Sequence, residues 1–216
     1  MLEVFLLSLI QGVTEFLPIS SSSHLIIASE FIDFKNKSLA IDVSLHIGSF
    51  IAVVSYFYKE IFSFLKNKDL FFKIIISSIP VIIVGFFLVK LNLIDKLRTI
   101  EIIGWTTIIF AILLYISDKF KLEKNVEKNF TYKSAILIGF FQILSLIPGV
   151  SRSGITITAG RFLNFKRYDA SKISFLLSIP TLAAVSIYGI NNLLTADNFS
   201  FTNLNIISII FSFIFS

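Results

Sequence analysis

The sequence predicts an all-α, polytopic integral membrane protein, folded as an inverted repeat with two re-entrant helical hairpins. The first observation is composition: the 216 residues are 55% hydrophobic and 15% charged, with mean hydropathy +0.86, whereas soluble domains carry about 25% charged residues. The second is a series of apolar segments of about 20 residues, the length that crosses a bilayer. The third is a pair of apolar segments interrupted by proline and serine.

The composition also limits the chemistry and the partners of the protein. The absence of cysteine excludes disulfides, thiolate catalysis and cysteine-bound metals. The net charge is +5, but the lysines and arginines cluster between apolar segments. This pattern is typical of loops that meet anionic lipid rather than of a nucleic-acid face. We therefore expect membrane lipid, and no nucleic acid, among the partners.

The first expected element is a broken segment over residues 2–30. Its start, "MLEVFLLSLIQGVTEF", has neither a basic region nor a small-residue cleavage site, so we interpret it as a retained membrane segment rather than a signal peptide. Pro18 and four serines then divide the segment into halves of about 13 residues, each only about 20 Å long as a helix. Because the hydrocarbon core is about 30 Å thick, we expect a re-entrant hairpin.

Simple spans follow where about 20 apolar residues run together. They are expected at residues 38–58, 70–89, 100–117 and 173–190. Residues 133–162, with "LIPGVSRSG" in the middle, predict a second re-entrant hairpin. A last apolar segment begins near Leu204 and continues to Ser216 without a polar flank, from which we expect a truncated C-terminus. The whole chain, 1–216, is expected to form one transmembrane domain.

The two broken segments align with each other. Placing Pro18 on Pro148 brings Ser21 onto Ser151. This suggests an internal duplication, with a first repeat over about 1–99 and a second over about 100–216. Lys and Arg favour cytoplasmic loops, and the loops rich in them are 59–69, 118–133 and 161–172. If these loops share the cytoplasmic side, the hairpins enter from opposite faces and their tips meet near the midplane.

Each hairpin tip carries the residues of an anion site. At each tip a half-helix is expected to begin at serines, near Ser21 in the first hairpin and near Ser151 in the second. The first N–H groups of such a half-helix have no intrahelical partners, and together with the helix dipole they attract negative charge. Arg152 adds a permanent cation whose planar fork suits phosphate oxygens. The residues expected to bind phosphate are Ser20, Ser151, Arg152, Ser153, Gly154 and Thr156. A ligand whose phosphate lies at that depth is expected to be a lipid phosphate.

Further polar residues are candidates for proton transfer or metal binding. Glu15 lies in an apolar run, where a carboxylate is costly unless it is paired. It could pair with Arg152 and hold the hairpins together, act as a general base, or bind a metal with Gln11, one turn earlier. His24 could transfer a proton or attack phosphorus directly. His46 could line the cavity, but we favour structural packing for it.

Two long segments, "QGVTEFLPISSSSHLII" and "LIPGVSRSGITITAGRFLNFKRYDASKISFLLSIP", closely resemble the signature regions of the undecaprenyl-diphosphatase family, also called the bacitracin resistance protein family. The first matches the family's (Glu/Gln)-x-x-x-Glu and Pro-x-Ser-Ser patterns. The second keeps Pro-Gly-x-Ser-Arg-Ser-Gly intact over 148–154. Many members have Thr-Gly in place of Ser22 and Ser23, and most run longer at the C-terminus.

This resemblance implies an enzyme of the bacterial inner membrane that hydrolyses undecaprenyl diphosphate to undecaprenyl phosphate and inorganic phosphate. The reaction recycles the lipid carrier for peptidoglycan synthesis and confers bacitracin resistance. The family's fold, an inverted repeat with two re-entrant hairpins and an active site reached from the periplasmic side, agrees with the topology expected from the loop charges. A homodimer remains open.

For this sequence we expect Glu15, Ser21, His24 and Arg152 to be catalytic. Arg152 would clamp the diphosphate while Ser21, activated by Glu15 or His24, attacks the terminal phosphorus. Attack by His24, or by water activated by Glu15, is the alternative. A divalent cation, Mg²⁺ or Ca²⁺, could bridge Glu15 and the diphosphate; no organic cofactor is expected. The competing hypothesis is a lipid-phosphate flippase or anion transporter, since broken helices in inverted repeats are frequent in transporters.

Overall fold

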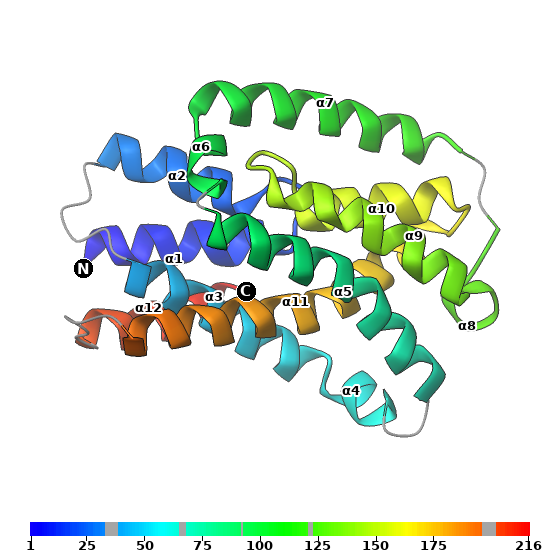
Figure 1. Ribbon diagram of the computed structural model, residues 1–216. Helices are drawn as coiled ribbons and strands as arrows, with labels where there is room; N and C mark the ends of the chain where they lie inside the picture. The colour runs from blue at the N-terminus through cyan, green and yellow to red at the C-terminus, as the bar shows by residue number, and fades with distance from the viewer. Residues whose placement is uncertain (33–38, 65–67, 92, 121–122, 196–201) are drawn as a thin grey trace.

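The computed structural model describes residues 1–32, 39–64, 68–91, 93–120, 123–195 and 202–216. Within these ranges the chain is all-α, with one isolated β-bridge between Lys124 and Phe165. The helices (Figure 1) are, in chain order, α1 (Leu2–Glu15), α2 (Ser21–Ile32), α3 (Leu39–Tyr56), α4 (Tyr58–Phe64), α5 (Lys68–Lys90), α6 (Ile94–Leu97), α7 (Ile100–Asp118), α8 (Val126–Asn129), α9 (Tyr132–Ile143), the 3-10 turn η1 (Leu144–Leu146), α10 (Arg152–Phe162), α11 (Arg167–Thr195) and α12 (Asn203–Phe215).

The expected membrane spans are present as helices. The starts of α3, α5, α7 and α12 lie within two residues of their expected positions. Among the described helices, α5, α7 and α11 are long and apolar enough to cross a membrane, and α3 and α12 are shorter apolar helices. The expected class, an all-α polytopic membrane protein, is therefore confirmed.

Helix α11 is longer than expected, since it begins at Arg167 rather than at residue 173 and ends at Thr195 rather than at 190. Its polar first turn is held by tertiary contacts. The Asp169 carboxylate accepts a hydrogen bond of 2.8 Å from the backbone N–H of Val126, and Ala170 is fully buried. Hydropathy marks only the apolar part of such a helix, so the expected boundaries were too short.

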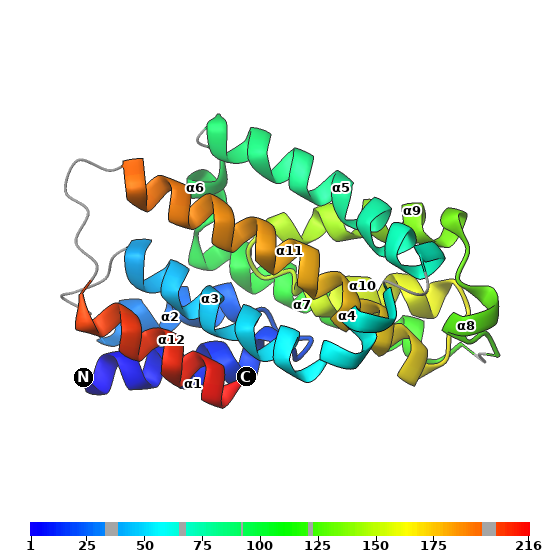
Figure 2. The same ribbon diagram turned by 90° about the horizontal axis from the view of Figure 1, so that it is seen from below.

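Two helical hairpins point toward each other from opposite ends of the molecule (Figures 1 and 2). Helices α1 and α2 form the first, and α9 and α10 form the second. Their tips touch where the Ser153 hydroxyl donates a 2.7 Å hydrogen bond to the carbonyl of Leu17. Both broken segments thus fold as hairpins whose tips meet. Their re-entry into a bilayer, and the repeat boundaries, stay predictions.

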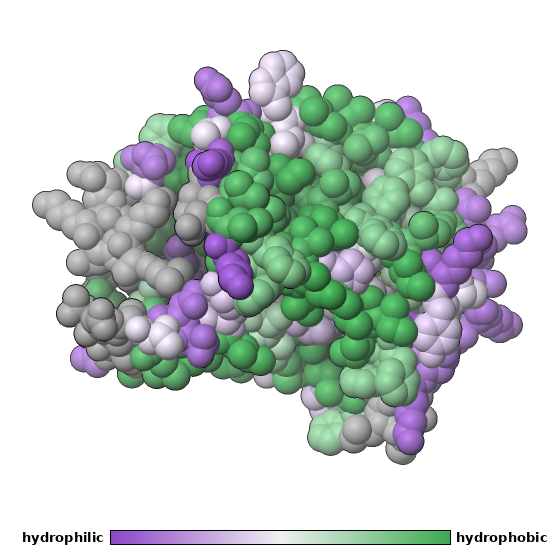
Figure 3. Space-filling view, in the orientation of Figure 1, coloured by the Kyte–Doolittle hydropathy of each residue, from purple (hydrophilic) through white to green (hydrophobic). Residues whose placement is uncertain are grey.

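The outer surface is apolar across the middle of the molecule. Helix α7 lies along one side (Figure 1) and buries only Ile103 and Ser117, while Trp105 and Tyr115 are 70% and 63% exposed. The space-filling view shows hydrophobic residues over the centre of this face and hydrophilic residues toward the right-hand end (Figure 3). An apolar belt of this kind suits contact with lipid chains.

The three basic loops share one end of the molecule. The loops that contain α4 and α8, and the connection from α10 to α11, all lie at the right of Figure 1. Two of them are joined by ion pairs of Asp118 with Arg161 and Arg167, at 3.0 and 2.5 Å. This placement agrees with the expectation that the three loops face the same compartment.

A polar seam fixes α3 next to α1 and α12. The Ser212 hydroxyl donates to the Leu45 carbonyl at 2.7 Å, and the Asn205 amide donates to the Ser44 hydroxyl at 3.2 Å. The helices approach so closely that a Cβ added to Gly48 would lie 2.5 Å from the carbonyl oxygen of Ile209. The position of α3 also sets the position of His46, which α3 carries.

Candidate active site between the hairpin tips

A cavity of about 200 Å³ lies where the two hairpin tips meet. It is lined by residues from both hairpins and from α3, α5 and α11. Its polar lining includes Glu15, Ser20, Ser21, Ser22, His46, Gln142, Ser145, Ser151 and Arg152. Most of the residues expected at the two tips therefore line one site.

Glu15 is the centre of this site. Its Oε2 accepts hydrogen bonds from the Ser21 hydroxyl at 2.6 Å and from the Gln11 amide at 3.0 Å. Its Oε1 lies 3.2 Å from Nη2 of Arg152, on the opposite hairpin. Glu15 thus holds the hairpins together and also contacts the candidate nucleophile, so the pairing role and the general-base role are both compatible with the geometry.

Arg152 is the first residue of α10 and lines the cavity together with Ser151, so the start of that helix lies at the cavity. The preceding residue, Ser151, caps the helix by accepting a 3.2 Å hydrogen bond from the N–H of Gly154. Nη1 of Arg152 donates to the Ser174 carbonyl at 3.4 Å. A helix start and a guanidinium at one cavity are groups that can bind an anion, and the bond to Ser174 holds the second arm of the guanidinium in place.

The first tip turns sharply at Ser20, which has φ +63°. Left-handed backbone is uncommon for a residue with a side chain and often marks a functional constraint. Here it carries the chain from Pro18 into the first turn of α2, so that Ser21 faces Glu15. The Ser20 hydroxyl lies 3.0 Å from that of Ser23.

The two histidines do not lie where the sequence led us to expect them. His24 is exposed, its Nδ1 lies 2.8 Å from the Ser20 carbonyl oxygen, and it does not line the cavity. His46, which we expected to pack structurally, lines the cavity instead. Its Nδ1 lies 3.2 Å from the Gln11 amide nitrogen and 4.0 Å from Oε2 of Glu15. An ionisable residue inside an apolar span is the signal that could have identified it.

Ser153, Gly154 and Thr156 lie behind the cavity rather than in its lining. Ser153 is bonded to Leu17, and Thr156 donates to the Ser174 hydroxyl at 2.8 Å, so both hydroxyls are used in packing. A Cβ on Gly154 would lie 3.1 Å from the Cβ of Ser151 and 3.5 Å from that of Pro18. These residues bring the tips together, and direct phosphate contacts by them stay predictions.

The described residues do not build a metal site by themselves. No group of three His, Asp or Glu side chains among them could hold an ion. Both oxygens of Glu15 are engaged, by Arg152, Ser21 and Gln11. A divalent cation would have to take most of its oxygen ligands from a bound diphosphate.

Two further cavities adjoin the site. An apolar groove of about 310 Å³ runs between α5 and α11 and shares Val81 and Leu146 with the site cavity. A cavity of about 320 Å³ shares Ser22 and His46 with it and extends to Glu30 near the end of α2. Its lining is mixed, and it is here called the polar cavity because charged side chains line it beside the apolar ones. The site is therefore flanked by one apolar space and one polar space.

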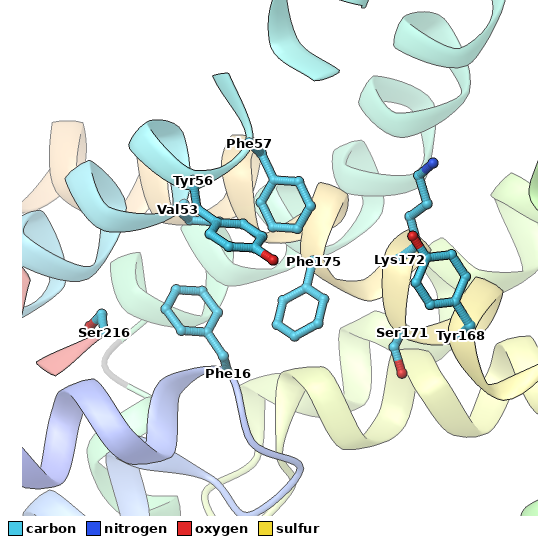
Figure 4. Close-up of a pocket in the computed structure, with 9 residues that line it drawn as sticks. All are labelled: Phe16, Val53, Tyr56, Phe57, Tyr168, Ser171, Lys172, Phe175 and Ser216. Carbon is cyan, nitrogen blue, oxygen red and sulfur yellow. The ribbon is translucent and has the colours of Figure 1, made fainter. Parts of the chain in front are cut away.

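A separate cavity of about 350 Å³ lies near the end of α3 and the start of α11 (Figure 4). The rings of Phe16, Phe57 and Phe175 gather in it, with centroids 6.0 and 5.8 Å apart along the series Phe16, Phe175, Phe57. The Lys172 amine points away from these rings. None of the expected site residues lines this cavity, and it lacks the converging polar groups of a catalytic site.

The fold and the site together define an integral membrane protein with a cavity between two opposed helical hairpins, lined by an arginine, a glutamate and several serines. Comparison with known families then assigns the chain. The model of the family described as "Bacitracin resistance protein BacA" matches residues 4–216. The chain belongs to this family, and the resemblance seen in its sequence motifs is confirmed.

Several curated relatives are similar over most of the chain. A protein named undecaprenyl-diphosphatase from Pelagibacter ubique (strain HTCC1062) is 48% identical over 216 residues, which cover 100% of this chain and 84% of the relative. Proteins of the same name from Jannaschia sp. (strain CCS1) and Alteromonas mediterranea are 40% and 42% identical over 208 residues, 90% of this chain and 78% of each relative.

Proposed function

We propose that this protein is an undecaprenyl-diphosphate phosphatase, which hydrolyses undecaprenyl diphosphate to undecaprenyl phosphate and inorganic phosphate. The observation that carries the proposal is the contact of Ser21 and Arg152 with the two oxygens of one buried carboxylate, Glu15. A hydroxyl, a base and a fixed cation at one cavity are the parts that phosphoryl transfer requires. The names of the relatives support hydrolysis and give no support to the transporter hypothesis.

In the first half of the reaction, Arg152 and the N–H groups at the start of α10 bind the diphosphate. Glu15 takes the proton of the Ser21 hydroxyl, and Oγ attacks the terminal phosphorus. The Oγ–P bond forms as the bond to the bridging oxygen breaks, and the electron pair leaves on the lipid phosphate, which takes the proton from Glu15. Arg152 stabilises the charge that develops on the transferring group.

In the second half, water attacks the phosphorus of the phosphoserine and gives a proton to Glu15. The P–Oγ bond breaks, Ser21 regains its proton from Glu15, and inorganic phosphate is released. The same carboxylate thus serves as base and then as acid in each half. Its hydrogen bond with Ser21 is the contact through which both proton transfers run.

The apolar groove supports a long prenyl chain as the other part of the substrate. It is lined by apolar side chains of α5 and α11, among them Ile82, Phe86 and Ala184, and it shares Val81 and Leu146 with the site cavity. A prenyl chain in this groove would place its diphosphate beside Arg152. Burial of isoprene units there would supply binding free energy that a soluble diphosphate lacks.

The orientation of the protein in the membrane is inferred from the residues at its two ends. The polar cavity extends toward the end formed by Glu30 and Asn192, opposite the three basic loops. If those loops lie in the cytoplasm, the site is reached from the outer side. We propose a multi-pass protein of the bacterial inner membrane whose active site faces the periplasm, where the released phosphate would leave through the polar cavity.

The test is phosphate release from undecaprenyl diphosphate by the purified protein. Wild type should release phosphate, and Ser21→Ala should reduce turnover by about 10³-fold or more, as loss of a nucleophile does. The control Ser117→Ala removes a buried hydroxyl that bonds only its own helix and should be normal. A protein that binds the lipid and moves it between leaflets without releasing phosphate, with Ser21→Ala merely weaker, would be a carrier.

A further inference from the structure

We propose that His46 binds the substrate phosphate as a neutral imidazole that donates a hydrogen bond through Nε2, and that Gln11 holds the ring in this tautomer. The inference rests on the proposed function, because it assigns a role within the same site. It follows from a chain of contacts that begins at Arg152 and ends at the His46 ring.

The first step concerns the orientation of the Gln11 amide. Glu15 is paired with the Arg152 guanidinium at 3.2 Å and accepts a hydrogen bond from Ser21, so it is ionised and has no proton to donate. The edge of Gln11 that faces Glu15 must therefore carry the N–H groups, with Nε2 at 3.0 Å from Oε2. The reversed amide would place its oxygen against a carboxylate.

The second step concerns the His46 ring. The same Nε2 of Gln11 lies 3.2 Å from Nδ1 of His46, closer than the 3.4 Å that separates it from the Ser49 hydroxyl. An amide nitrogen only donates, so Nδ1 must offer its lone pair, and the single ring proton of a neutral imidazole then lies on Nε2. An imidazolium would direct a second proton from Nδ1 against the N–H groups of Gln11. The contact therefore favours the neutral Nε2–H form.

The third step concerns where this donor points. His46 lines the site cavity together with Ser21 and Arg152, and it also lines the adjoining polar cavity. Its side chain is 23% exposed, and Nε2 has no hydrogen-bond partner among the residues that the structure describes. The seam with α12 fixes α3 at Ser44 and Leu45, next to His46, and Gln11 contacts the ring itself. A hydrogen-bond donor at the cavity that would hold the diphosphate can stabilise a phosphate oxygen that gains negative charge during phosphoryl transfer.

The steady-state experiment compares His46→Ala with His46→Gln on undecaprenyl diphosphate. His46→Ala should lower kcat/KM by about 10- to 100-fold, as loss of one hydrogen bond to a charged group does. His46→Gln keeps an N–H at the end of the side chain and should restore most of that loss. The control Ser55→Ala, on an exposed position of the same helix, should be normal. Equal activity of His46→Ala and wild type, or equal loss in both His46 variants, would overturn the proposal.

The tautomer is tested independently of activity by ¹⁵N NMR of the histidine ring in detergent. The His46 signals are assigned by their absence from His46→Gln, and wild type should show the neutral form protonated at Nε2. Gln11→Ala should abolish this preference. A ring protonated at Nδ1 in wild type would overturn the inference. A wild type that shows the expected tautomer but releases no phosphate would count against the proposed function alone.

Discussion

The hydroxyl oxygen of Ser21 lies 2.6 Å from Oε2 of Glu15, across the turn that separates α1 from α2. The two residues belong to one hairpin, and the cation that pairs with Glu15 comes from the other. The first tip therefore supplies the proposed nucleophile and base, and the second supplies the positive charge. Neither hairpin is complete without the other, so the junction of the tips is where function and stability depend on the same contacts.

Glu15→Gln should prevent proton transfer from Ser21, while the side chain keeps nearly the same size and shape. The amide cannot accept the Ser21 proton as a base, so turnover should fall by about 10²- to 10⁴-fold, the usual contribution of general-base catalysis. Phosphate release from undecaprenyl diphosphate measures this. Glu101→Gln, an exposed position at the start of α7, is the matched control and should be normal. Normal turnover in Glu15→Gln would contradict the mechanism.

Arg152→Lys should show that the shape of the cation matters as well as its charge. The guanidinium reaches Glu15 with one arm and the Ser174 carbonyl with the other. A lysine amine cannot span both, so turnover should fall by about 100-fold, the loss expected for a misplaced transition-state donor. Arg167→Lys, at an exposed ion pair with Asp118, should change activity and stability little. Similar effects of the two substitutions would refute this reading of Arg152.

Local sequence predicted much of the site. Gln11 and Glu15 are four residues apart on a helix, and they form the expected same-face contact. The loop charges predicted that the two hairpin tips meet, and Glu15 of the first tip does contact Arg152 of the second. Hydropathy located the spans because lipid exposure demands long apolar runs.

What the sequence could not predict depends on packing between distant segments. His24 is close to Ser21 along the chain, but α2 turns its ring outward to the Ser20 carbonyl. His46 reaches the site only because α12 fixes α3 beside α1, a relationship between residues more than 150 positions apart. Thr156 has the right chemistry for phosphate, yet its hydroxyl is taken by Ser174. Which polar side chains face the cavity is decided by tertiary contacts.

Divalent ions should bind only when diphosphate is present. Glu15 is neutralised by Arg152, and the described residues offer no three-ligand group. Calorimetric titration of Mg²⁺ or Ca²⁺ into the substrate-free protein should therefore show no saturable binding, whereas binding should appear when inorganic pyrophosphate is added. Saturable binding without pyrophosphate, abolished by Glu15→Gln, would show instead that the protein builds its own metal site.

Ala184→Phe should discriminate between long and short prenyl chains. Ala184 lines the apolar groove between α5 and α11, and a phenyl ring there would occupy the space proposed for isoprene units. KM for undecaprenyl diphosphate should rise about tenfold, equivalent to about 1.4 kcal/mol of lost apolar contact, while KM for a short prenyl diphosphate should change less. Ala111→Phe, at an exposed position on α7, is the control. Equal changes in KM for both substrates would show that the prenyl chain does not bind in this groove.

Gly149→Ala should destabilise the second tip and displace Arg152, whereas Gly104→Ala should do neither. Gly149 has φ +92°, and a Cβ there would lie 1.9 Å from the Thr106 hydroxyl oxygen. That hydroxyl donates a 2.6 Å hydrogen bond to the Pro148 carbonyl and so docks the tip on α7. A Cβ on Gly104 would meet nothing within 4 Å.

The expected loss in Gly149→Ala is at least about 1–3 kcal/mol from backbone strain alone, because the steric clash with Thr106 adds to it. Thermal unfolding in detergent should show a lower Tm for Gly149→Ala, together with reduced turnover, since the start of α10 must shift. Gly104→Ala should be neutral or slightly stabilising, because alanine is the better helix former. If both variants unfolded at the wild-type temperature, α7 would not be what holds the second tip in place, and the position of Arg152 would depend on its pairing with Glu15 alone.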